Sequence, residues 1–140
     1  MKVLVVGGGG REHAICRALA TSRPHPEVLV APGNAGTASS FRNIDISPMD
    51  VPRLVELARE EHVDLVIPGP EAPLAAGLAD ALNAAGVPCC GPSRAAARIE
   101  SSKAFMRGLT SEAGVPGPTY RIARDRAALA ELPEAEDSLS

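Results

Sequence analysis

The sequence lacks any long hydrophobic run, and this absence limits where the protein can work. No stretch approaches the roughly 20 apolar residues that cross a bilayer, and the N-terminus runs straight into a short apolar segment without the pattern of a signal peptide. Positive charge is also scarce, because 14 Lys and Arg residues stand against 17 Asp and Glu and are scattered rather than clustered. We therefore expect a cytoplasmic protein that binds neither membranes nor nucleic acid.

Cysteines and catalytic patterns are equally sparse. The three cysteines, Cys16, Cys89 and Cys90, are an odd number without metal-ligand spacing, so we expect reduced thiols in the core. No Ser-His-Asp order, carboxylate pair or Cys-His pair can be argued from the sequence. The catalytic residues are therefore unknown, no metal site is expected, and the sequence favours a domain that binds a ligand.

The chain does contain short apolar runs that alternate with segments of helical periodicity. The apolar runs, typical of parallel strands covered on both faces, are residues 2–6, 27–31 and 64–68, with shorter runs at 43–46 and 87–91. The segments with helical periodicity are residues 11–20, 50–62 and 73–86. This alternation predicts an α/β fold with a doubly wound parallel sheet of about five strands.

A change of pattern after Gly91 indicates a domain boundary. Two successive helices, broken near Ser101, precede a Pro-rich connection to a possible strand, then one short helix and an acidic end. We expect an α/β domain over residues 1–100 and a different region over residues 101–140. The chain is expected to stop inside something larger, because its acidic end has no capping element.

Four consecutive glycines follow the first apolar run and lead into a helix that begins near Arg11. They are Gly7, Gly8, Gly9 and Gly10. Ligands of open α/β sheets bind beyond the carboxyl ends of the strands, where bare N–H groups and a helix N-terminus can hold an anion. A tight turn needs only one or two glycines, so four favour the close approach of a phosphate. Arg11 is expected to contact this ligand, and the role of His13 stays open.

The known phosphate motifs are incomplete in this sequence. A dinucleotide fingerprint that starts at Gly7 needs glycine where this chain has Glu12, and no acidic residue ends the second strand to hold a ribose. A P-loop needs a Gly-Lys pair, and the sequence has none. A small phosphorylated metabolite is therefore favoured as the ligand, and an NAD(P)-binding Rossmann domain is the alternative.

Two further strand-end loops carry candidate ligand contacts. Asn34, in "APGNAGTA", can donate and accept hydrogen bonds beside an accessible backbone. Glu71, in "PGPEAPLAAG", stands among prolines at a strand end, a rigid position from which a carboxylate could hold sugar hydroxyls. The competing interpretation of Glu71 is a helix-start carboxylate that serves only the helix dipole.

Four stretches in this order, "VLVVGGGGREHA", "VAPGNAGTA", "GPEAPLAAGLADAL" and "CGPSRAAARIESSKAFMR", closely resemble the N-terminal part of the phosphoribosylamine–glycine ligase family, from Met1 to about Tyr120. The resemblance implies the Rossmann-like domain that precedes an ATP-grasp module. It further implies an enzyme of purine biosynthesis that joins glycine to 5-phosphoribosylamine while ATP is cleaved to ADP and phosphate. By this resemblance Gly7 to Arg11 would receive the substrate phosphate, Glu71 would contact the ribose, and Lys103 would reach an ATP phosphate.

The sequence departs from this family in two ways. Gly8 stands where many members carry asparagine, and family members continue for several hundred residues beyond the length of this chain. The resemblance therefore implies ATP with Mg²⁺ or Mn²⁺ as cofactors of a longer ligase, in which residues 101–140 form a linker helix and the truncated start of an ATP-grasp domain. Alone, this chain is expected to be a monomer or weak dimer that binds phosphoribosyl compounds weakly and catalyses nothing. A non-catalytic phosphosugar-binding module or truncated product is the alternative.

Overall fold

The computed structural model describes residues 1–130, and the chain divides between Ser101 and Ser102 into two compact units. The strands of the first unit are β1 (Lys2–Gly7), β2 (Glu27–Pro32), β3 (Arg42–Asn43) and β4 (Leu65–Pro68). Its helices are α1 (Gly10–Thr21), α2 (Ala35–Ala38), α3 (Val51–Glu60), α4 (Ala72–Ala75), α5 (Leu78–Ala84) and α6 (Arg94–Ser101). The acidic end expected from the sequence, at 131–140, lies outside the described residues.

The four strands form one parallel sheet in the order β3-β2-β1-β4. From β1 the chain moves outward to β2 and β3 and then crosses back to place β4 on the free side of β1. The direction of winding therefore reverses between β1 and β4, which is the topological switch point of a doubly wound sheet. The predicted fold class is confirmed.

The expected fifth strand over residues 87–91 does not form. Cys89 makes only an isolated parallel bridge to Val66, with hydrogen bonds from Val66 N to Pro88 O and from Cys90 N to Val66 O. Proline has no backbone N–H to donate to a ladder, and the sequence Gly91-Pro92 follows immediately. The described part of the sheet therefore has four strands, not about five.

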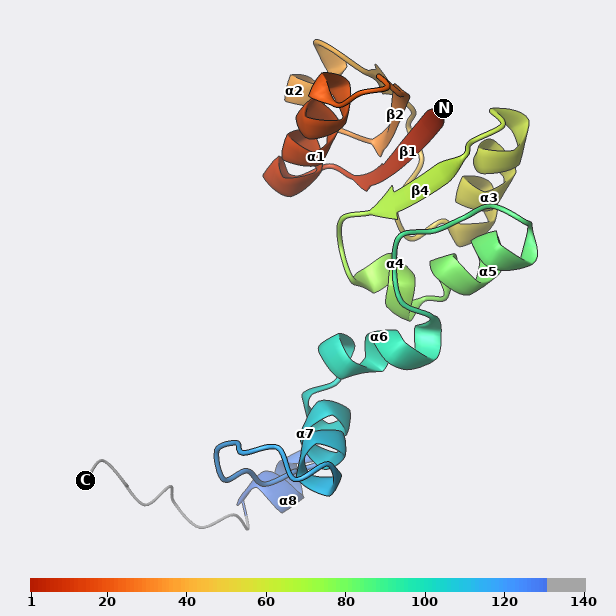
Figure 1. Cartoon of the computed structure of the whole chain (residues 1–140). Coiled ribbons are helices and arrows are strands. Elements are labelled where there is room, and N and C mark those ends of the chain that lie inside the picture. Colours follow the sequence, from red (N-terminus) through yellow and green to blue (C-terminus); the bar gives the residue numbers. More distant parts are fainter. Residues whose placement is uncertain (131–140) are drawn as a thin grey trace. The chain divides into compact units, whose positions relative to one another are not determined.

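Alternate residues of the strands build two cores on opposite faces of the sheet. Leu4, Val6 and Leu29 pack with the buried leucines of α3 and α5, whereas Val3 and Val5 pack with Cys16 of α1. Figure 1 shows α1 on one side of the strands and α3 and α5 on the other. Because side chains point alternately to the two faces, continuous valine-rich runs supply both cores at once.

Two expected helical segments differ in detail from the structure. Residues 73–86 form two helices, α4 and α5, because Gly77 between them has a φ of +100°, which interrupts a right-handed helix. Gly86, expected at the helix C-terminus, follows α5 with a φ of +77°. The loop expected at residues 31–38 contains the short helix α2.

The second unit contains α7 (Lys103–Glu112) and α8 (Arg126–Ala130). Ser102 caps α7, and its Oγ accepts a hydrogen bond from Phe105 N at 3.3 Å. Within residues 102–130 no strand follows the Pro-rich connection, and neither helix has a fully buried residue. Within the described part of the chain, no helix is long and apolar enough to cross a membrane.

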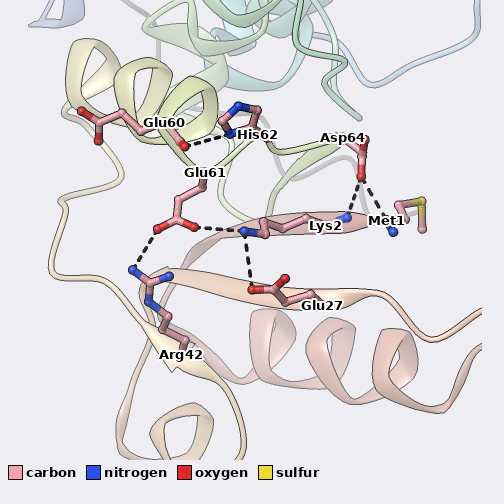
Figure 2. Close-up of polar contacts among 8 residues, drawn as sticks. All are labelled: Met1, Lys2, Glu27, Arg42, Glu60, Glu61, His62 and Asp64. Atoms are coloured by element: carbon pink, nitrogen blue, oxygen red, sulfur yellow. Dashed lines mark hydrogen bonds and ion pairs between the residues drawn. The ribbon is translucent and has the colours of Figure 1, made fainter.

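Charged residues link the amino ends of the strands, at the edge of the sheet opposite the glycine loop (Figure 2). Lys2 Nζ lies 3.0 Å from Glu61 and 3.6 Å from Glu27, and Arg42 lies 2.8 Å from Glu61. The hydrogen bond with Glu61 raises the pKa of Lys2 above its ordinary 10.5. Hydrogen bonds from Lys2 and then Arg42 lower the pKa of Glu61 below 4.5. Asp64 adds a bond from Lys2 N at 2.7 Å, so this network joins β1, β2, β3 and the entry to β4.

Candidate functional site

Three loops meet at the carboxyl ends of the strands. The glycine loop follows β1, the Gly33–Asn34 turn follows β2, and the Gly69–Glu71 turn follows β4. Gly33 N donates to Gly7 O at 3.1 Å, and Gly69 N donates to Val6 O at 2.8 Å. The backbone therefore fixes the glycine loop from both sides at the switch point.

Glu12 lies at the centre of these loops. It belongs to the first turn of α1, and only 4% of its surface is exposed. Its Oε2 accepts a hydrogen bond from Gly9 N at 2.5 Å, and its Oε1 accepts one from Arg11 Nε at 3.2 Å. A buried carboxylate needs such donors, because an unpaired buried charge is costly. Sequence reasoning used Glu12 as evidence against a dinucleotide fingerprint and did not assign it a place in the site.

The Glu12 side chain explains why three of the surrounding residues are glycines. A Cβ built on Gly7 would lie 2.7 Å from Glu12 Cγ, one on Gly9 would lie 2.8 Å from Oε2, and one on Gly69 would lie 1.8 Å from Oε1. Gly7 also has a φ of +131°, which disfavours any side chain. The Glu12 side chain therefore crowds all three positions, and a side chain at any of them would displace its atoms.

The other two glycines of the loop differ from each other. A Cβ on Gly8 would lie 2.7 Å from the carbonyl oxygen of Gly33. By contrast, a Cβ on Gly10 would have no described atom within 4 Å beyond its chain neighbours and the nearby backbone of α1. Contacts within the chain therefore disfavour a side chain at Gly7, Gly8 and Gly9. They give no reason for a glycine at position 10. The inference from four glycines to a close ligand thus rests on Gly10.

Asn34 connects the loop after β2 to the glycine loop. Its Oδ1 accepts hydrogen bonds from Gly36 N at 2.7 Å and Thr37 N at 3.0 Å, which caps α2. Its Nδ2 donates to Gly8 O at 2.9 Å and reaches Gly9 O at 3.5 Å. Both ends of the side-chain amide are engaged, so Asn34 holds the shape of the predicted phosphate loop.

Arg11 and His13 extend from the same helical turn to different surroundings. The side chain of Arg11 is 62% exposed, and only its Nε is engaged, by Glu12, within the described residues. His13 is half-buried, and its Cε1 would lie 2.8 Å from a Cβ on Gly36. Arg11 can therefore offer its terminal nitrogens to an anion, while the His13 ring packs over the start of α2.

The structure places Glu71 beside the site and Lys103 in the other unit. Glu71 is exposed at the N-cap of α4, and its side chain makes no cap hydrogen bond within the described chain. Its carboxylate is therefore available to a ligand, and the alternative of a helix-start carboxylate that serves only the helix dipole stays open. Lys103 is exposed at the first position of α7, in the second unit.

The cysteines are free thiols in three different environments. Cys16 is buried, and burial raises its pKa to about 11. Burial also raises the pKa of the half-buried Cys89 to about 11. Cys90 is exposed, so the expectation of a core position is wrong for this residue. Within residues 1–130, no group of three or more His, Cys, Asp or Glu side chains could hold a metal ion.

The sheet order and the glycine loop at its switch point define a doubly wound, Rossmann-like domain. Residues 1–100 match the family model described as phosphoribosylglycinamide synthetase, N domain. The chain therefore belongs to this family, as the resemblance of its motifs indicated.

Named relatives agree with this assignment. The chain is 48% identical over 122 residues to the phosphoribosylamine–glycine ligase of Rhodopirellula baltica, covering 87% of this chain and 28% of that protein. It is 48% identical over 124 residues to the same-named enzyme of Allochromatium vinosum, covering 87% of this chain and 29% of the relative. The crystal structure of phosphoribosylamine–glycine ligase from Thermotoga maritima matches its fold with a TM-score of 0.67 at 23% identity, over 94% of this chain and 29% of that one. The chain thus spans less than a third of the length of these relatives.

Proposed function

We propose that this chain is the N-terminal, substrate-binding part of a phosphoribosylamine–glycine ligase of purine biosynthesis. The observation that carries the proposal is the match of residues 1–100 to the family, on a fold that gathers the predicted substrate loops at one sheet edge. The longer enzyme would join glycine to 5-phosphoribosylamine with cleavage of ATP. Its substrates would be these small molecules, and its location would be the cytoplasm.

The proposed substrate site uses the three loops in different ways. Gly10 and Arg11 would contact the phosphate, since α1 leaves its first N–H groups without helical partners and the Arg11 guanidinium is exposed. Gly7, Gly8 and Gly9 would shape the loop, and Asn34 would hold it through Gly8 O. The exposed carboxylate of Glu71 would accept hydrogen bonds from ribose hydroxyls.

The described residues do not fit the cofactors of the complete ligase. They offer no metal cluster and, toward ATP, only the exposed Lys103 without a second glycine-rich loop. The ATP-dependent step, with Mg²⁺ or Mn²⁺, would therefore belong to the rest of a longer protein, and residues 101–140 would form the linker and the start of an ATP-grasp domain. This chain by itself would bind substrate and catalyse nothing.

The test is a calorimetric titration of the chain with phosphoribosylglycinamide, beside NAD and ATP. Arg11→Ala is the informative variant, and Arg17→Ala is its matched control, because Arg17 is an exposed arginine of the same helix. We expect the wild type and Arg17→Ala to release heat of binding when phosphoribosylglycinamide is added. With Arg11→Ala the affinity should fall about tenfold, the worth of one charge-assisted contact. Binding of NAD alone would establish the dinucleotide alternative, and no binding at all would refute a substrate site in this chain.

A further inference from the structure

Glu12 stands where the dinucleotide fingerprint has its third glycine. In the dinucleotide fingerprint the second glycine lets the backbone approach the pyrophosphate, and the third lets the helix pack closely on the strand. Here Gly7 and Gly9 supply the first two glycines, and the third position is Glu12. Its buried carboxylate fills the space between the loops after β1 and β4, where a Cβ on Gly69 would lie 1.8 Å from Oε1.

The carboxylate also controls which donors the loop can offer. It takes the N–H of Gly9, which would otherwise face an incoming phosphate. It holds Arg11 by Nε, which leaves the terminal nitrogens of the exposed guanidinium available to an anion. A second negative group placed at the exposed Gly9 would be repelled by the charge of the buried Glu12 carboxylate beside it.

We propose that Glu12 is a specificity-determining and positioning residue: it closes the switch point to a dinucleotide pyrophosphate and restricts the loop to a single phosphate held by Gly10 and Arg11. The single-phosphate half of this proposal rests on the proposed function. The exclusion of dinucleotides stands on the geometry of Glu12 alone. The observations behind this exclusion are the burial of Glu12, its hydrogen bonds with Gly9 and Arg11, and the glycines that its side chain crowds.

The test compares the wild type with Glu12→Gly and Glu12→Gln in titrations with phosphoribosylglycinamide and with ADP-ribose. Glu12→Gly restores the full fingerprint from Gly7 and removes both hydrogen bonds. Glu12→Gln keeps the size of the side chain and one acceptor oxygen but removes the charge. Circular dichroism and a cooperative melt establish that each variant is folded. Amide exchange at Gly9 reports the state of the loop without any ligand.

We expect no detectable ADP-ribose binding by the wild type. Glu12→Gly should bind ADP-ribose with an affinity at least about tenfold above the detection limit set by the wild type, because the Gly9 N–H is released as a donor. Phosphoribosylglycinamide should bind about tenfold more weakly to Glu12→Gly, and Glu12→Gln should recover part of this loss because it can still accept from Gly9 N. Amide exchange at Gly9 should be fastest in Glu12→Gly.

The outcomes separate this proposal from the proposed function. Failure of the wild type to bind the ribonucleotide would refute the substrate site, while the ADP-ribose and exchange results would still decide the role of Glu12. A folded Glu12→Gly that gains no ADP-ribose binding would overturn the exclusion of dinucleotides, and one that exchanges Gly9 like the wild type would overturn the positioning role. Where Glu12→Gly does not fold, Glu12→Gln decides: unchanged ribonucleotide affinity and unchanged exchange would overturn it.

Discussion

Gly69→Ala offers the most direct test of how the strand-end loops are packed. The added Cβ would lie 1.8 Å from Oε1 of Glu12, 2.4 Å from Cδ and 2.5 Å from Cγ. Gly69 is not among the glycines with positive φ, so the effect of this substitution is a steric one. The Glu12 side chain would have to leave its site and give up its hydrogen bond from Gly9 N.

The size of the effect follows from these contacts. Overpacking of a filled site costs about 1–3 kcal/mol, and a lost hydrogen bond to a charged group costs about 1.5–3 kcal/mol. Loss of unfolded-state freedom on replacing glycine offsets about 0.4–1 kcal/mol. We therefore expect the free energy of unfolding to fall by about 2–4 kcal/mol, which lowers the Tm of a domain of this size by about 10 °C or more.

The assay is urea unfolding of a double-mutant cycle. An alanine in place of Glu12 has no atoms beyond Cβ, so Gly69→Ala should cost little in the background of Glu12→Ala, and the two changes should be strongly non-additive. Gly10→Ala is the control, since beyond the nearby backbone of α1 its methyl group would meet no described atom within 4 Å, and it should be neutral or stabilising. An unchanged urea midpoint for Gly69→Ala, or the same loss in both backgrounds, would refute the packing argument.

Three further predictions concern other parts of the first unit. Because the pKa of Glu61 is lowered, its contribution to stability is present above pH 4.5 and is lost as the pH falls through the folded-state value. Glu61→Gln should therefore lower the Tm at neutral pH, with a difference that closes in acid; a constant difference would contradict this. Asn34→Ala should cost about 1–2 kcal/mol in urea unfolding, because the cap of α2 and the bond to Gly8 are both lost, and a cost near zero would argue against the link between the loops. With a thiol reagent at neutral pH, Cys90 should react rapidly and Cys16 and Cys89 slowly, since burial raises their pKa to about 11; equal rates in the folded protein would count against the structure.

The interpretation of the glycine run shows where sequence reasoning stopped short. Four adjacent glycines were expected to mark the close approach of a ligand, yet Gly7, Gly8 and Gly9 are each crowded by the chain itself. A hint was present in the sequence, because Glu12 stands three residues after Gly9, the spacing at which a helix-start glutamate reaches back to the N-cap. That spacing could not show that the same carboxylate also meets Gly69, 57 residues beyond Glu12 in a chain of 140.

The sequence by itself determined the local elements and the order in which they alternate. Apolar runs of valine and leucine define β1, β2 and β4, and helical periodicity defines α1 and α3, because side-chain periodicity is a local property of the chain. The family could also be identified from the order of the motifs, and residues 1–100 match it.

Only the tertiary structure decided which residues share the switch point. Crossing from β3 to β4 brings Gly69 beside β1, and Glu12 then fills the space between the two loops. The same folding makes Asn34 a brace for the glycine loop through hydrogen bonds at both ends of its amide. Such contacts depend on strand order and on the space left between loops, which are non-local. The local pattern therefore predicts a candidate site at these strand ends but not the Glu12 side chain that lies between the loops.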